Sequence, residues 1–214
     1  MDEQPADDTA TWEKNRIEAL TDGVFVFAMT LLATSMILPH AAEAPALTAA
    51  GALILLIPDF IHYVIAFFVL AAFWTAHHIQ FNQIRFITRP FLTLNIIGLF
   101  FVTLVPFTTS FVGDYPDTLA SIVFELNLMV LGLMMFMQWY YAACHRRLIS
   151  SRYPESKVQE GLLRNLTIPV LSLAGMIVAL AGSRESTMIY LLSPLVAYVV
   201  TRYYAKEPQN GKTG

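Results

Sequence analysis

Residues 91–112 read FLTLNIIGLFFVTLVPFTTSFV and contain no charged side chain. A helix needs about 20 mostly apolar residues to cross the hydrocarbon core of a bilayer, so this stretch predicts a transmembrane helix. Five other stretches have the same character: residues 17–38, 53–76, 119–143, 165–182 and 187–204. The sequence therefore predicts an all-α membrane protein with six transmembrane helices per subunit.

The composition agrees with this fold class. Of the 214 residues, 56% are hydrophobic and 14% are charged, and the mean hydropathy is +0.56. The six spans fill one domain at 14–205, between a polar tail at 1–13 and a second tail at 206–214 that is predicted to be disordered. Cys144 is the single cysteine, which excludes an internal disulfide and any multi-cysteine metal site.

Pro58 leaves the start of the second span open. A proline lacks the backbone N–H, and a helix tolerates that loss best in its first turn. If Pro58 opens the helix, residues 53–57 become an interfacial lead-in and the span runs from Pro58 to Ile79. That length still suffices to cross the bilayer.

Lysine and arginine residues lie almost wholly on one side of the predicted spans. The loops at 40–52, 113–118 and 182–186 carry only Arg184 of the thirteen. Because positive side chains are retained in the cytoplasm, both termini are predicted to be cytoplasmic. The other twelve are Lys14, Arg16, Arg85, Arg89, Arg146, Arg147, Arg152, Lys157, Arg164, Arg202, Lys206 and Lys212.

Asp22 lies inside the first predicted span, where a charge costs about 2.5 to 3.5 kcal/mol on insertion scales. Arg16 precedes it on the same helix and is expected to reach it as an ion pair, and Thr21 adds a hydroxyl. Two interpretations remain open: a structural ion pair that holds the cytoplasmic end of this helix, and a direct role in transport.

The second span ends with polar and aromatic residues at the same depth. Trp74 and His77 are three residues apart and share a helix face, so both can point at a carboxylate such as Asp22. Asn95, early in the third span, can join them. Alternatively, Trp74 belongs to the interfacial aromatic belt and the histidines face water, which is the interpretation we favour for His78.

Other polar residues in the spans suggest structural roles. Asp59 and Glu125 are interpreted as helix-capping or interhelical hydrogen-bonding groups, with a proton relay as the alternative. Five histidines are too few, and too spread out, for a two-metal centre. Protease and hydrolase motifs are missing from the sequence, so we expect a protein that is not an enzyme and binds no cofactor or resident metal.

The first span carries a narrow stripe of apolar and hydroxyl residues. Phe27, Leu31, Thr34 and Leu38 follow one face at helical spacing, with Thr30 at its edge. Such a stripe is typical of a packing face in lipid. Symmetric copies around an axis would instead make it the wall of a pore with hydrophobic constrictions.

The residues RIEALTD at 16–22 resemble the R-x-x-x-F-S-D signature of the transmembrane protein 175 family of potassium channels, in its single-repeat prokaryotic form. Residues 74–78 (WTAHH) resemble the W-x-x-H-H pattern of that family, and Asn95 with residues 104–108 (LVPFT) resembles its third helix. Leu20, Thr21 and Phe27 stand where the family has phenylalanine, serine and isoleucine.

The resemblance implies a homotetramer in the cell (plasma) membrane, in which the first helix of each subunit lines a central pore. That pore passes K⁺ in preference to Na⁺ and has no TVGYG filter, and this sequence has none. The resemblance puts the constriction at Phe27, Leu31 and Thr34, with Thr30 and Leu38 also lining the pore. It also implies a supporting network of Arg16, Thr21, Asp22, Trp74, His77 and Asn95.

Two other functions stay open. One is a proton-coupled or proton-conducting transporter that uses Asp22, His77, Asp59 or Glu125, although the sequence has no inverted repeat. The other is a nonconducting homologue, because four phenylalanine rings at a constriction can close it.

Overall fold

The computed structural model describes residues 13–34, 36, 48–115, 117–183 and 185–206. These residues form helices, with one isolated bridge between Ile84 and Ile149 that joins two loops. The α-helices are α1 (Lys14–Thr34), α2 (Ala49–Leu55), α3 (Ile57–Phe81), α4 (Arg89–Asp114), α5 (Thr118–Ala143), α6 (Glu155–Leu180) and α7 (Ser193–Lys206), with 3₁₀ helices η1 (Cys144–Arg146) and η2 (Ser186–Leu192). The predicted tails lie almost wholly outside these residues.

Five of the described helices are long and apolar enough to cross a membrane: α1, α3, α4, α5 and α6. The chain is therefore a multi-pass membrane protein. The sixth predicted span, 187–204, is divided between η2 and the 14 residues of α7. Pro194 in the first turn of α7 explains the division, because proline lacks the backbone N–H that would continue the hydrogen bonding of the preceding helix.

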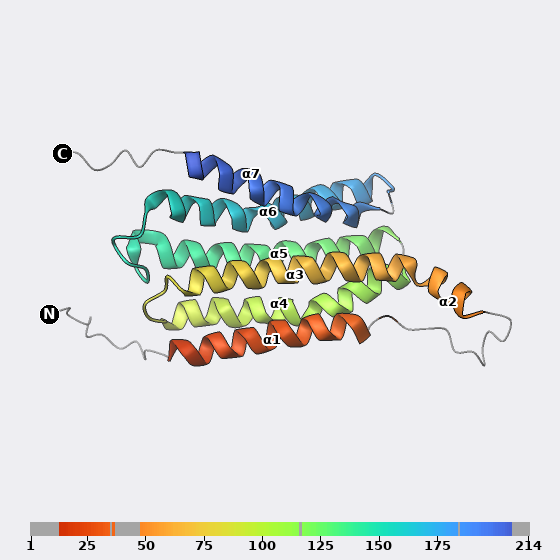
Figure 1. Cartoon of the computed structure of the whole chain (residues 1–214), viewed down its shortest axis with the longest axis horizontal. Coiled ribbons are helices and arrows are strands. Elements are labelled where there is room, and N and C mark those ends of the chain that lie inside the picture. The colour runs from red at the N-terminus through yellow and green to blue at the C-terminus, as the bar shows by residue number, and fades with distance from the viewer. Residues whose placement is uncertain (1–12, 35, 37–47, 116, 184, 207–214) are drawn as a thin grey trace.

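The six-span count stays a prediction. In Figure 1, η2 and α7 return along α6 from one end of the bundle towards the other. Seven residues at about 2.0 Å and fourteen at about 1.5 Å give roughly 35 Å, which is enough to cross. The start of α1 and the end of α7 lie at the same end of the bundle (Figure 1), as an even number of crossings requires. The side of the membrane that they face stays a prediction.

The region around Pro58 follows the second of the two boundaries predicted above. Residues Ala49–Leu55 form the separate short helix α2, and α3 begins at Ile57 with Pro58 in its first turn. The span predicted at 53–76 is therefore wrong at both boundaries, since α3 continues to Phe81. Residues 53–55 lie in α2, before the spanning helix, as the second alternative predicted, whereas Ile57 already belongs to α3. The interfacial position of this lead-in stays a prediction.

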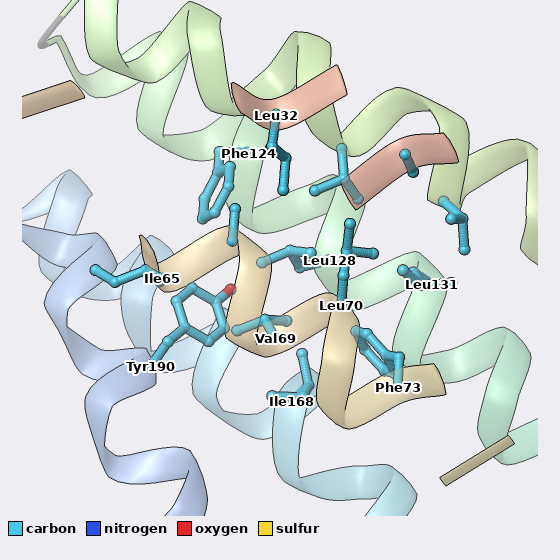
Figure 2. Close-up of a cluster of buried hydrophobic side chains, with 14 of the residues drawn as sticks. Leu32, Ile65, Val69, Leu70, Phe73, Phe124, Leu128, Leu131, Ile168 and Tyr190 are labelled. Carbon is cyan, nitrogen blue, oxygen red and sulfur yellow. The ribbon is translucent and has the colours of Figure 1, made fainter. Parts of the chain in front are cut away.

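The core runs through the middle of the bundle, where α5 packs against both α4 and α6. Helix α1 packs on α3 and α4 at one side, and η2 and α7 pack on α6 at the other (Figure 1). Side chains from six elements, α1, α3, α4, α5, α6 and η2, meet in one apolar cluster. Figure 2 shows part of it, including Leu32, Leu70, Leu128, Ile168 and Tyr190. Among the described residues, one long face of α1 therefore packs on no other helix.

Candidate functional site

Helix α1 has two chemically similar faces that meet different surroundings. Ile17, Thr21, Phe25, Ala28 and Leu32 are buried against the rest of the subunit. Their spacing of three or four residues keeps them on one stripe of the helix. The opposite stripe contains the residues that the sequence analysis selected as pore-lining.

That opposite stripe is exposed in the single subunit. The side chain of Phe27 is 62% exposed and that of Leu31 is 37% exposed, and Thr30 and Thr34 are exposed as well. Leu38 lies outside the described residues. An apolar face of this size is unusual on a monomer and indicates contact with lipid or with another chain.

The two threonines on this stripe bind their own helix. Thr30 Oγ1 donates to the carbonyl of Phe27, and Thr34 Oγ1 donates to that of Leu31, each at 2.8 Å. A hydroxyl that donates its hydrogen to a backbone carbonyl keeps its oxygen lone pairs free to act as acceptors. The exposed stripe therefore combines apolar side chains with oxygen acceptors, which can approach a cation.

A polar network joins α1, α3 and α4 near the end of the bundle where α1 begins. The indole Nε1 of Trp74 donates to Asp22 Oδ1 at 2.8 Å. Asn95 Nδ2 donates to Thr21 Oγ1 at 3.0 Å. With the amide placed in this way, Asn95 Oδ1 accepts from His77 Nε2 at 3.2 Å.

Burial makes this network structurally important. Thr21, His77 and Asn95 are all buried, and Asp22 is half-buried. The ring of His77 is also packed against that of Phe81, with centroids 4.0 Å apart. Because a buried polar group without a partner is costly, each bond fixes the position of one helix against another.

The expected ion pair between Arg16 and Asp22 is not among the salt bridges of the described residues. Arg16 is exposed. Six residues separate the two, which puts them about 120° apart around the helix and about 9 Å apart along it. Arg16 therefore faces away from the network inside the subunit, and that part of the prediction is corrected.

His78 is half exposed and lies close to a residue that the sequence analysis did not single out. Its Nδ1 is 3.7 Å from Glu18 Oε1, and its ring stacks on Trp74 with centroids 5.8 Å apart. Glu18 lies four residues before Asp22, on the face of α1 that turns towards α3. That spacing is the signal that could have identified it.

Glu125 takes the interhelical role that we expected. It is fully buried on α5, and Tyr190 of η2 donates a hydrogen bond to its Oε2. Ser172 of α6 in turn lies 2.8 Å from the Tyr190 hydroxyl. Tyr190 and Ser172 were missed because a lone tyrosine and a lone serine in an apolar run carry no signal of their partner. Asp59 lies in the first turn of α3, where a carboxylate suits the helix dipole.

Comparisons with known proteins agree on one family. The family described as "Endosomal/lysosomal potassium channel TMEM175" matches residues 16–106, from Arg16 on α1 to Pro106 on α4. A potassium channel of Streptomyces collinus is 30% identical over 135 residues, which are 60% of this chain and 64% of that protein. A potassium channel of Chamaesiphon minutus is 27% identical over 150 residues, 68% of this chain and 74% of that protein.

This chain is similar to the TMEM175 family over residues 16–106, which make up less than half of its length. The matched stretch covers less than two thirds of the Streptomyces relative. The endosomal/lysosomal proton channel TMEM175 of Bos taurus is 31% identical over 119 residues, which are only 25% of its length. The TMEM175 match includes every residue of the polar network.

The TMEM175 fold extends over nearly the whole chain. The crystal structure of a lysosomal potassium-selective channel TMEM175 homologue from Chamaesiphon minutus superposes with a TM-score of 0.70 at 24% identity, covering 90% of this chain and 96% of that one. The structure of the potassium channel MtTMEM175 gives a TM-score of 0.61 at 19% identity, covering 97% and 100%. At these identities the likeness concerns the fold alone.

Proposed function

We propose that this chain is the subunit of a potassium-permeable cation channel in the cell (plasma) membrane, and that it is not an enzyme. The relatives named as potassium channels support the choice of ion. The observation that carries the proposal is the exposed stripe of α1, with Phe27, Leu31, Thr30 and Thr34 on one face. Passive permeation needs no cofactor, only K⁺ and a bilayer.

The proposed channel is a homotetramer, because one α1 cannot enclose a pore. Closed cyclic symmetry would bring identical copies of the stripe together around an axis. The resemblance to the family implies four copies. In that arrangement Arg16, which is exposed at the start of α1, can bind a neighbouring subunit instead of Asp22.

The proposed constriction is a ring of Phe27 side chains, followed by Leu31 and Thr34 one and two turns further along α1. Rings that meet on an axis exclude water and oppose ion entry by dewetting. A dehydrated ion finds no backbone carbonyl filter here. K⁺ then passes more easily than Na⁺ because it loses its hydration shell at lower cost, and the acceptor oxygens of Thr30 and Thr34 offset part of that loss.

Substitution of Phe27 tests this function. In liposomes containing the full-length protein, Phe27→Ala should raise total cation flux, because it widens the ring. Phe27→Asn should raise flux and also bring Na⁺ permeability closer to that of K⁺, because an amide solvates either ion. Both flux rates are measured together with the melting temperature of each variant.

Phe107→Ala is the matched control, because Phe107 on α4 has the same 62% exposure outside the stripe. It should leave flux and selectivity unchanged. Destabilised Phe27 variants with wild-type permeability would contradict the constriction. The mass of the protein in nanodiscs should correspond to four copies, and a stable monomer would remove the pore.

Proton conduction is a second candidate, favoured by the bovine relative that is named a proton channel. The same liposomes, loaded with a pH-sensitive dye and free of permeant metal cations, distinguish the two functions. Acidification of the interior that depends on the protein would support proton passage. K⁺ flux without acidification would support the potassium channel alone.

A further inference from the structure

A groove opens on the side of the bundle between α3, α6 and the η2–α7 segment. Its volume is about 350 Å³, within the range of about 300 to 1,000 Å³ that is typical of small-molecule sites. Its walls are mostly apolar, with Phe68 and Ala72 from α3, Ile168 from α6, and Leu191 and Ala197 from the η2–α7 segment. We call it the lateral groove.

The lateral groove adjoins a polar pocket of about 160 Å³. The two share Ala76 and Arg164 as lining residues. Between them, Gln80 of α3 donates to Asn165 of α6 at 3.0 Å, and both side chains are buried. Arg164 therefore lines both the groove and the polar pocket.

The charges in the polar pocket favour an anion. Lys157 Nζ binds Glu160 Oε2 at 2.6 Å, so these two charges offset each other. Arg164 has no hydrogen bond or salt bridge to any other residue that the structure describes. Tyr153 adds a donor, since burial raises the pKa of its phenol and keeps it protonated. One uncompensated guanidinium therefore faces the junction.

The groove and the pocket lie at the depths that suit a phospholipid. Arg164 immediately precedes the apolar run 165–182 of α6, at the end of the bundle that carries the basic loops. Basic side chains at this level lie near lipid phosphates, and basic pockets between helices on the cytoplasmic side bind anionic headgroups. The groove continues from there into the hydrocarbon region.

We propose that the lateral groove and the polar pocket together bind one anionic phospholipid of the cytoplasmic leaflet. An acyl chain fills the groove, and the lipid phosphate binds Arg164. A second copy of the chain is a poorer occupant. Helix α1 packs on α3 and α4 and makes no packing contact with α6 or α7 (Figure 1), so the groove faces away from the axis. The statement that the groove faces away from the axis rests on the proposed function.

Lipid titration of the full-length protein tests this site by native mass spectrometry. The probes are phosphatidylglycerol and phosphatidylcholine with identical acyl chains. Wild type should bind phosphatidylglycerol about tenfold more tightly, the size expected for one charge-assisted contact. Arg164→Gln should abolish this preference. Arg152→Gln, an exposed arginine at the same end of the bundle, should retain it.

A second pair of variants tests the groove. Ala72→Trp places a ring in the groove from an exposed position and should weaken the binding of both lipids. Ile177→Trp, at an exposed position elsewhere on α6, should leave the binding of both lipids unchanged. Excess inorganic phosphate should fail to displace phosphatidylglycerol, because phosphate cannot fill the groove.

Three results would overturn the proposal. They are equal losses in Arg164→Gln and Arg152→Gln, unchanged binding in Ala72→Trp, and disulfide-linked dimers of Ala72→Cys in a Cys144→Ala background. The last would place a second copy in the groove. Lipid binding is measured independently of ion flux. A protein that conducts no ions but still prefers phosphatidylglycerol would contradict the proposed channel and support the proposed lipid site.

Discussion

Asp22 depends on a neutral donor, because its nearest cation along the helix points elsewhere. The indole of Trp74 supplies the one hydrogen bond that the structure shows for its carboxylate. A carboxylate in a span costs several kcal/mol unless it is bound. The partly buried Trp74–Asp22 bond should therefore contribute more to stability than an exposed hydrogen bond would.

Trp74→Phe removes this donor and keeps most of the ring. We expect a loss of about 1 to 3 kcal/mol in the free energy of unfolding, because Asp22 is left half-buried without its partner. Thr75→Ala is the control. Its hydroxyl is exposed and bonds only to the backbone of Ala71. Thermal melting of the purified oligomer measures both, and equal melting temperatures would show that the bond is dispensable.

Asp22→Ala should disturb assembly as well as stability, because Trp74 then loses its acceptor and α1 loses one of its polar contacts with α3. Size-exclusion chromatography and melting temperature report this loss. Normal oligomers with normal stability, altered only in ion preference, would assign Asp22 to selectivity instead.

Single side chains were predictable where a short motif carried them. Trp74, His77 and Asn95 follow from the resemblance, and helical spacing places them at the depth of Asp22. The predicted pairing of Arg16 with Asp22 was wrong because closeness in sequence does not bring two side chains together on a helix. Each residue turns the helix by 100°, so a separation of six residues points them in different directions. The partner of Glu125 could not be predicted from the sequence, because periodicity shows which face of a helix is apolar but not which other helix packs against it.

Helices α5 and α6 pack closely where Gly132 faces Pro169. A Cβ at Gly132 would lie 2.5 Å from Pro169 Cδ, and a proline ring on a packed helix cannot swing aside. Gly132→Ala should therefore cost about 1 to 3 kcal/mol by overpacking, more than the ~1 kcal/mol that alanine gains in helix propensity.

Gly98→Ala serves as the comparison, because here the gain in helix propensity should equal or exceed the cost of overpacking. Its Cβ would meet the amide end of Gln138 at 3.2 Å, and that flexible group can move. We expect a stability near wild type or slightly above it. Chemical or thermal unfolding measures the stability of both variants. Equal losses of stability in Gly132→Ala and Gly98→Ala would mean that contact with Pro169 does not cause the destabilisation of Gly132→Ala.

Element boundaries were predicted well where prolines mark them and poorly where they divide a span. Pro58 begins α3, which the sequence allowed as one of two alternatives. Pro194 interrupts the apolar run 187–204, and the sequence analysis read that run as one helix. Hydropathy measures how apolar a window is and is blind to a change from 3₁₀ to α geometry.

The topology of the whole molecule can be tested with introduced cysteines in a Cys144→Ala background. Thr118→Cys, at the start of α5, and Ser156→Cys, at the start of α6, should react with impermeant thiol reagents from opposite sides. Thr213→Cys should react from the same side as Ser156→Cys if η2 and α7 cross the membrane. Labelling of Thr213→Cys from the Thr118 side would leave five crossings.

The bond from Tyr190 to Glu125 also has a consequence for biosynthesis. Its two residues are 65 positions apart, so at about 5 to 20 residues per second Glu125 leaves the ribosome roughly 3 to 13 seconds before its donor. During that interval α5 carries an unpartnered carboxyl group, which lipid alone accepts poorly. We therefore expect α5 to stay beside the insertion machinery until η2 emerges and Tyr190 supplies the donor for Glu125.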